Sequence, residues 1–177
     1  MTNVKIWSPN AGRVSVILAD TEEEIELVRA GEHFVISEPL EVGTRYFVSV
    51  DGGLRLPDPR SMCQPDGPHG PTEVVDPTAF QWTDSDWTGE NLHGKIFYEM
   101  HVGAFTREGT FRSAIERLDY LADLGVDVVQ LMPIAPMPGE RGWGYDGVSI
   151  FALHHPYGRP DDLVALIDAI HARGMSA

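Results

Sequence analysis

The stretch KIFYEMHVGAFTREGTFRSAIERLDYLADLGVDVVQLMP (residues 95–133) carries the pattern that decides the fold. KIFYEMHV at its start predicts a buried strand, and VDVVQLM (126–132) predicts a second one, because near-continuous apolar runs suit a parallel sheet covered on both faces. Between them, Gly109 and Thr110 open a helix that Gly125 ends. Its apolar residues recur at helical spacing: Phe111, Ile115, Leu118 and Leu121 or Ala122.

A second helix is predicted from Pro160, which suits the first helical position. Asp161 and Asp162 lie in the first turn, where the helix dipole favours negative charge. The apolar stripe consists of Leu163, Leu166, Ile167 and Ile170. Gly174 follows as the end of this helix. Strand, helix, strand, helix is a β/α repeat, and right-handed crossovers make its sheet parallel.

The amino-terminal third of the chain has a different pattern. Residues 4–51 contain four short strand-like runs divided by turn residues: VKIW, RVSVIL, HFVI and RYFVSV. This spacing predicts a small all-β sandwich, immunoglobulin-like, over residues 1–55. Residues 56–94 are too rich in proline and glycine for regular elements and predict a linker or strap. The β/α domain then occupies residues 95–177.

The composition narrows the possible partners and compartments. Thirteen Lys and Arg against 27 Asp and Glu give a net charge of −14, which disfavours binding to nucleic acid or to anionic membranes. Cys63 is the only cysteine, which excludes an intrachain disulfide and suits a reducing cytoplasm. It has no base nearby in the sequence, so a nucleophilic role is disfavoured. The start of the chain has no apolar signal region. The sequence also lacks the run of about 18 apolar residues that would predict a membrane span.

The connection between the second strand and the second helix, residues 133–159, is unusually long. It follows the carboxyl end of a strand, which is the face that carries the active site in β/α barrels. Trp143 and Tyr145 offer flat aromatic faces that suit the C–H faces of a sugar, and Arg141 and Asp146 could bond its hydroxyls. The alternative is that the rings anchor the loop to its own scaffold.

Other polar residues in this region predict no cofactor. His154 and His155 are adjacent, with His171 further on, but they lack the HxxxH spacing or the second carboxylate of a metal site. His101 lies on the first predicted strand with Glu99, and we interpret it as a buried, hydrogen-bonded structural residue. The glycines of the loop do not form the GxGxxG of a phosphate-binding turn.

The motifs YEMHVGAFTREGTF (98–111), RGWGYDG (141–147) and PYGRPDDL (156–163) resemble the opening of an α-amylase-family barrel. Together with LPDPRSMCQPDGPHGPTEVVD (56–76), they are most similar to the maltooligosyltrehalose trehalohydrolase group of that family. The resemblance implies retaining hydrolysis of the α-1,4 bond next to the terminal trehalose of maltooligosyltrehalose, without a redox cofactor or a catalytic metal. It also implies that Tyr145 stacks on the sugar at the cleavage subsite, with Trp143 and Arg141 on the same wall.

The resemblance also implies that no catalytic residue lies in this sequence. A retaining glycosidase needs two carboxyl groups about 5 to 5.5 Å apart, and in this family they follow later barrel strands. We therefore expect an inactive amino-terminal part of the enzyme, truncated after two barrel units. Two alternatives stay open: a fragment of a glycogen branching or debranching enzyme, and a non-catalytic glucan-binding module. The module would need exposed rings on the sandwich, whereas we expect its strand aromatics to be core: Trp7, Phe34, Tyr46 and Phe47.

Overall fold

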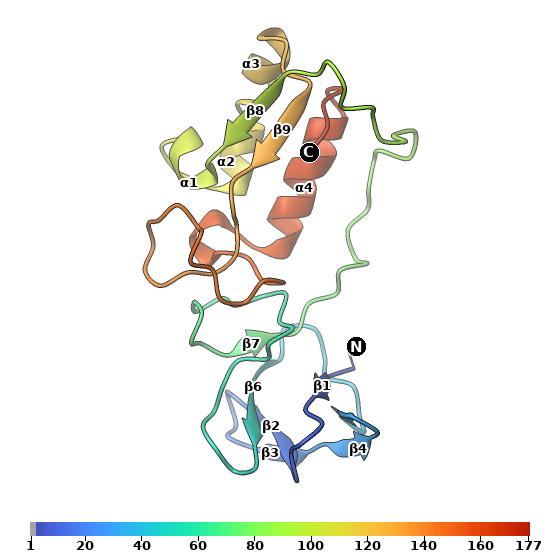
Figure 1. Ribbon diagram of the computed structural model, residues 1–177, viewed down its shortest axis with the longest axis vertical. Coiled ribbons are helices and arrows are strands. Elements are labelled where there is room, and N and C mark those ends of the chain that lie inside the picture. The colour runs from blue at the N-terminus through green and yellow to red at the C-terminus, as the bar shows by residue number, and fades with distance from the viewer. Residues whose placement is uncertain (1–2) are drawn as a thin grey trace.

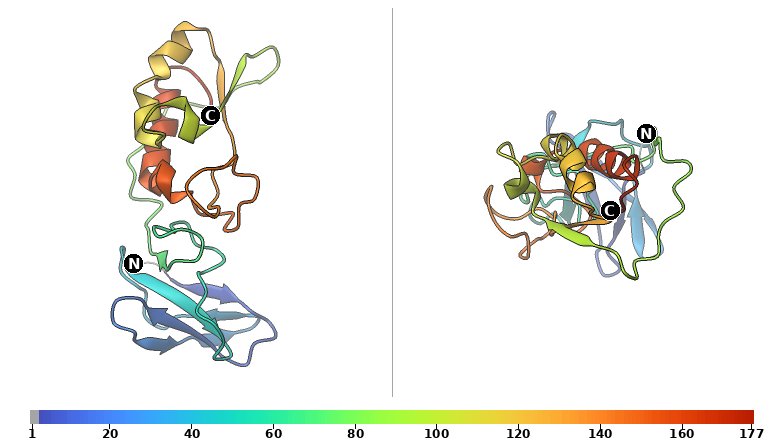
Figure 2. Two further views of the ribbon diagram at one scale, coloured as in Figure 1. Left: turned by 90° about the vertical axis from the view of Figure 1, so that its left-hand side faces the viewer. Right: turned by 90° about the horizontal axis from the view of Figure 1, so that it is seen from above.

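The computed structural model describes residues 3–177 as an elongated molecule with two lobes (Figure 1). One lobe holds the antiparallel strands of the first part of the chain, and the other holds a parallel strand pair with helices on one side (Figure 2). Each lobe has its own cluster of buried apolar side chains. Among the described residues, no helix is long and apolar enough to cross a membrane.

Two antiparallel sheets form the amino-terminal lobe. The first has the strand order β1 (Lys5–Trp7), β5 (His33–Val35), β4 (Val28–Ala30). The second has the order β3 (Glu24–Glu26), β2 (Val14–Leu18), β6 (Arg45–Val50), β7 (Thr72–Glu73). Buried residues of both sheets share one core, among them Ile6 and Phe34 from the first and Val16 and Val48 from the second. Successive strand residues point to opposite faces, so one face of each sheet contributes to this core.

The aromatic residues of these strands are only partly core. Phe34 and Tyr46 are buried, and Phe47 is half-buried. Trp7 was expected in the core, and that expectation is wrong, because its side chain is 60% exposed. The alternation along β1 explains this: Ile6 points into the core, so its neighbour Trp7 must point outward. The indole Nε1 of Trp7 donates to Glu32 on this outer side, over 3.3 Å.

The second lobe is built on two parallel strands, β8 (Phe97–Met100) and β9 (Val128–Leu131). Three short helices connect them: α1 (Val102–Phe105), α2 (Phe111–Ile115) and α3 (Leu118–Asp123). After β9 come a long loop, the short 3-10 helix η1 (His155–Tyr157) and α4 (Pro160–His171). The chain then returns beside β9, where Ser176 forms a parallel bridge with Val128. The second predicted helix is thus present, with Pro160 as its first residue.

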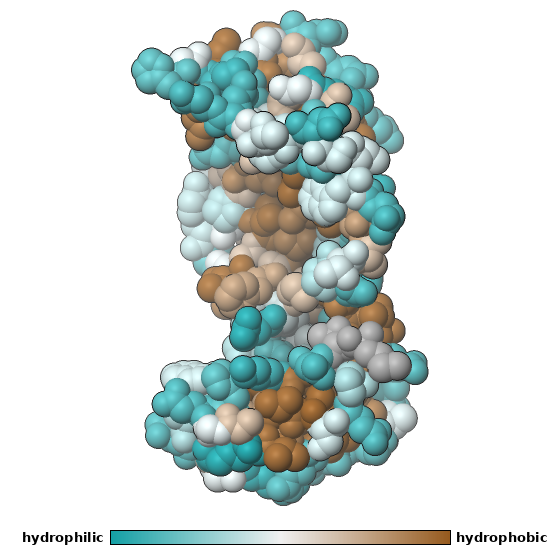
Figure 3. Space-filling model, turned by 90° about the vertical axis from the view of Figure 1, so that its right-hand side faces the viewer, coloured by the Kyte–Doolittle hydropathy of each residue, from teal (hydrophilic) through white to brown (hydrophobic). Residues whose placement is uncertain are grey.

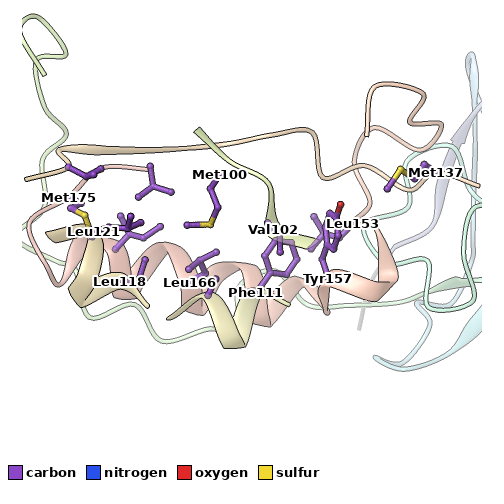
Figure 4. Packing of buried hydrophobic residues seen from close by; sticks show 14 residues of the cluster. Met100, Val102, Phe111, Leu118, Leu121, Met137, Leu153, Tyr157, Leu166 and Met175 are labelled. Atoms are coloured by element: carbon purple, nitrogen blue, oxygen red, sulfur yellow. The ribbon is translucent and has the colours of Figure 1, made fainter. Parts of the chain in front are cut away.

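The helices cover one face of the strand pair and enclose its core (Figure 4). Met100 of β8, Phe111 of α2, Leu118 of α3 and Leu166 of α4 are each at most 1% exposed. Burying a side chain of this size contributes roughly 1.5 to 3 kcal/mol. Leu153 and Tyr157 lie at the end of this core that faces the long loop (Figure 4), so the loop and the core are packed together.

The opposite face of the strand pair is less covered than the sequence predicted. KIFYEMHV was expected to be a buried strand, but only Phe97–Met100 is a strand, and Phe97 is 46% exposed. Ile96, directly before it, is 57% exposed. For Phe97 the reason is that the described helices pack on the other side of the strands (Figure 2). Apolar side chains also reach the surface in both lobes (Figure 3).

The first predicted helix is divided into α2 and α3 at Glu116 and Arg117. The backbone N–H of Arg117 donates to the carbonyl of Ala114, three residues earlier, which tightens the turn. Phe111 and Leu118 are seven residues apart and both fully buried, so the break leaves the apolar faces of the two segments on the same side. The helical spacing of the apolar residues therefore does not reveal the break.

The later part of the predicted strap, residues 76–94, runs beside α4 (Figure 1). Asp168 of α4 accepts hydrogen bonds from both the backbone N–H and the hydroxyl of Thr83, at 2.7 and 2.8 Å. His171 lies 2.7 Å from the carboxylate of Asp84. The ring of Trp87 is stacked on the His171 ring, with centroids 3.9 Å apart. The strap is thus attached to the helix along two of its turns.

Candidate functional site

The candidate site is the connection between β9 and α4, residues 132–159. Two backbone hydrogen bonds fold its outer part back onto its own stem. Val148 donates to the carbonyl of Pro136 over 2.9 Å, and His154 donates to the carbonyl of Ile134 over 2.7 Å. The connection is therefore a folded structure, and it begins directly after the carboxyl end of β9.

Glycines allow this close folding. Gly144 has φ +83°, a left-handed conformation that a side chain disfavours, and a Cβ added there would overlap the carbonyl oxygen of Pro133. A Cβ added at Gly142 would lie 2.7 Å from Sδ of Met137. Met137 itself is 1% exposed. The glycines of RGWGYDG therefore let the chain pass against its own stem while the residues between them turn outward.

The two aromatic candidates are among the most exposed rings of the described chain. Trp143 is 73% exposed and Tyr145 is 71% exposed, whereas Gly144 between them is buried. Arg141 is also exposed. Since the two rings bury so little of their surface, they contribute little to anchoring the loop on its scaffold.

An open groove of about 590 Å³ lies beside this loop. Its lining combines the loop with the end of β8 and with α1, and consists of His101, Ala104, Met132, Arg141, Gly142 and Trp143. Arg141 and Trp143 thus come together at the groove, while Tyr145 is exposed on the same loop outside this lining.

Among the described residues, those that line the groove include no Asp or Glu. Asp146 and Glu140 are exposed elsewhere on the loop.

His101 connects the loop to the strand pair. Its Nε2 lies 2.8 Å from the carbonyl oxygen of Gly142, and the hydroxyl of Tyr157 lies 3.5 Å from the same nitrogen. The rings of His101 and Tyr157 meet edge to face. The sequence suggested a structural histidine but gave no sign of this contact, because its partner is a backbone carbonyl 41 residues away.

His154 is part of the packing beneath the loop. It is fully buried, its Nε2 lies 3.2 Å from the carbonyl of Glu140, and its ring meets that of Tyr157 edge to face. Burial lowers the pKa of His154 below its ordinary value, so the ring is neutral at pH 7. His155 is exposed. Within residues 3–177, no three His, Cys, Asp or Glu side chains gather as a metal site would require.

The base of the loop is held to the amino-terminal lobe. Arg159 donates through Nη2 to Oε1 of Glu73 over 2.5 Å, and Arg45 donates through Nε to Oε2 of the same carboxylate over 3.2 Å. Burial of Glu73 acts to raise its pKa, but the two guanidinium groups outweigh it and hold the pKa below its ordinary value. A charged Glu73 therefore joins β7 to the residue that precedes α4.

Comparison with known proteins gives a consistent result. The family model "Alpha amylase, catalytic domain" matches residues 74–177. A malto-oligosyltrehalose trehalohydrolase of Deinococcus radiodurans is 46% identical over 98% of the chain, and one of Arthrobacter ramosus is 42% identical over 97%. A crystal structure described as a putative alpha amylase from Salmonella typhimurium covers 98% of the chain with 42% identity and a TM-score of 0.89. The chain spans 29 to 30% of the length of these three proteins.

Proposed function

The chain belongs to the α-amylase family, and from this premise we propose that it forms the amino-terminal part of a trehalohydrolase. Such an enzyme cleaves the α-1,4 bond next to the terminal trehalose of maltooligosyltrehalose and releases trehalose. The observation that carries the proposal is the similarity to two trehalohydrolases over nearly the whole chain, amino-terminal lobe and loop included. We also propose the cytoplasm as its compartment, for which the single cysteine is the support.

The strand connections support the architecture that we propose. The sheets of β1 to β7 correspond to an immunoglobulin-like sandwich (1–55) with its strap (56–94), and residues 95–177 to the first two units of a (β/α)8 barrel. The parallel bridge of Ser176 to β9 supports this, because it lies where a third barrel strand begins. In such barrels the active site lies at the carboxyl ends of the strands. The loop after β9 is at that end.

We assign the substrate wall to three residues of this loop. The exposed rings of Trp143 and Tyr145 provide apolar faces for glucose units, and a guanidinium such as Arg141 donates to hydroxyl groups. The groove beside Trp143 and Arg141 supports this assignment, because its floor also contains the apolar side chains Ala104 and Met132. Together with the similarity to two trehalohydrolases, this wall supports an α-glucan as the substrate class.

Bond cleavage requires more than this wall. Retaining hydrolysis needs a nucleophilic carboxylate and an acid/base carboxyl group about 5 to 5.5 Å apart. The described lining of the groove has no carboxylate, and we propose that both groups come from parts of the polypeptide outside these 177 residues. The chain by itself is then expected to bind glucan without cleaving it.

The two alternatives have less support. A glucan-binding module would need several exposed rings on one sheet face, but of its four candidate aromatics only Trp7 is exposed. A branching enzyme shares the barrel, so the reaction product must distinguish it. Both alternatives are separated from the proposal by the same assay.

The test is trehalose release from maltotriosyltrehalose, measured in parallel for the 177-residue chain and for a longer polypeptide in the same reading frame. Release by the longer polypeptide alone supports the proposal. Transfer of glucan branches by the longer polypeptide would assign it to the branching enzymes instead. Binding without any turnover by the longer polypeptide would favour a glucan-binding module.

A further inference from the structure

We propose that His101 is a positioning residue that holds the Arg141–Trp143 segment in place over the groove. This inference rests on the proposed function for its consequence in glucan binding, but not for its structural basis. The basis is the 2.8 Å contact between Nε2 of His101 and the carbonyl of Gly142, which joins the end of β8 to the middle of the loop.

The partner of Nε2 identifies which ring nitrogen of His101 is the donor. A carbonyl oxygen can only accept a hydrogen bond, so Nε2 of His101 carries the proton and donates it. The other nitrogen, Nδ1, is buried and has no hydrogen-bond partner among the described residues. A buried polar atom without a partner is unfavourable, so packing alone does not account for a histidine here. The hydrogen bond from Nε2 of His101 to the loop accounts for the histidine at this position.

The hydrogen bond from His101 to Gly142 lies between Arg141 and Trp143 in the sequence, so it affects the position of both. Gly142 lies between Arg141 and Trp143, so a shift of its carbonyl shifts the backbone of both. The ring of His101 is itself confined. A Cβ added at Gly103 would lie 2.9 Å from the Tyr157 ring and 3.2 Å from the His101 ring. His101 therefore sits in a fixed slot between α1 and Tyr157 and holds the loop from a fixed point.

Proteolysis of the native 177-residue chain tests the contact without any ligand. Trypsin cleaves after Arg141, which is the bond next to the anchored carbonyl of Gly142. His101→Phe keeps a ring but removes the donor, and we expect it to raise the cleavage rate after Arg141 about three- to tenfold. His101→Gln keeps a donor at similar reach and should stay within about twofold of the original chain. Cleavage after the exposed Arg107 is the internal control and should not change.

A glucan titration tests the consequence. The emission of Trp143 is followed as maltoheptaose is added, with Trp143→Phe as the blank for the other three tryptophans. We expect His101→Phe to weaken binding by a factor similar to its effect on proteolysis, and His101→Gln to restore it. If the original chain gives no Trp143-dependent signal, the proposed glucan site fails, while the proteolysis result still decides the role of His101.

Equal cleavage after Arg141 in the original chain and in His101→Phe, with both folded by circular dichroism, would overturn the proposal. If His101→Phe does not fold, His101→Asn takes its place, because its amide is too short to reach the Gly142 carbonyl. His101→Asn is then expected to behave as predicted for His101→Phe. Unchanged cleavage after Arg141 in that variant would also overturn the proposal.

Discussion

Glu73 of β7 accepts a hydrogen bond from Arg159, the residue that precedes α4, although the two lie 86 positions apart in the chain. The Glu73 side chain is 8% exposed, and Arg45 of β6 bonds its second oxygen. This contact ties the returning end of the candidate substrate loop to the antiparallel sheets. The amino-terminal lobe therefore contributes to the position of the loop as well as to the stability of the chain.

Replacing Glu73 by Gln should lower the free energy of unfolding by about 1 to 3 kcal/mol, because two guanidinium groups lose their shared carboxylate. The effect should stay below that of a fully buried pair, since Arg159 is half-exposed and water partly screens it. Urea unfolding at pH 7 measures the change. Glu22→Gln, at the exposed pair with Arg55, is the matched control and should change stability by less than about 1 kcal/mol.

The same carboxylate predicts a pH dependence. The pKa of Glu73 is lower in the folded chain than its ordinary value of 4.5, so the unfolded chain binds its proton more readily. The stabilisation is therefore present above about pH 5 and is lost as the pH falls below 4.5 through the folded pKa. The difference in unfolding free energy between the original chain and Glu73→Gln should shrink as the pH falls from about 5 through the folded pKa of Glu73. A constant difference over that interval would contradict the assignment.

Gly144→Ala should disrupt the candidate substrate loop, residues 132–159, more than Gly139→Ala. Both glycines have positive φ, which costs an alanine about 1 to 2 kcal/mol. At Gly139 nothing lies near the added Cβ, whereas at Gly144 it overlaps the Pro133 carbonyl, which adds about 1 to 3 kcal/mol. Hydrogen exchange over residues 142–148 should increase more in Gly144→Ala than in Gly139→Ala. Equal exchange in the two variants would show that the loop does not need its close approach to Pro133.

The strap should loosen when its stacked ring is removed. Trp87 packs on His171, so Trp87→Ala is expected to increase hydrogen exchange of residues 81–90 and to lower the unfolding free energy by about 1 kcal/mol. Leu92, which is 52% exposed, provides the control substitution to Ala. No change in exchange on loss of Trp87 would mean that the Thr83 and Asp84 contacts hold the strap without it.

Residues 95–177 produced alone should associate or remain loosely packed. Ile96 is 57% exposed and Phe97 46% exposed, and the described helices cover the opposite face of the strands. Size-exclusion chromatography should show oligomers, and Phe97→Ser should reduce them. A sharp monomeric peak with cooperative unfolding would show that this lobe is sufficient by itself.

The sequence predicted the elements better than their contacts. The apolar runs and helical spacing correctly indicated β9 and α4, because these signals depend on local periodicity. The break before Leu118 gave no signal, since it preserves that periodicity. The exposure of Trp7 depends on which face of a three-residue strand meets the second sheet, which hydrophobicity alone does not determine.

Of the candidate site, the sequence indicated the loop but not the groove. The long loop after β9 and its glycines could be recognised from the sequence, and the exposure of Trp143 and Tyr145 follows from the turns that those glycines allow. The groove could not be predicted, because His101 and Ala104 reach it from a distant part of the chain. The same holds for the ion pair of Glu73 with Arg159, which depends on how the two lobes pack.

The most direct test of the substrate wall is the kcat/KM of the longer polypeptide for trehalose release from maltotriosyltrehalose, compared for Tyr145→Ala and Ile150→Ala. Ile150 is 77% exposed on the same loop and provides a control of similar exposure. Loss of a stacking ring should reduce kcat/KM for Tyr145→Ala by about three- to tenfold, with Ile150→Ala within about twofold of the original enzyme. Equal values for the two variants would contradict the assignment of this loop to the substrate.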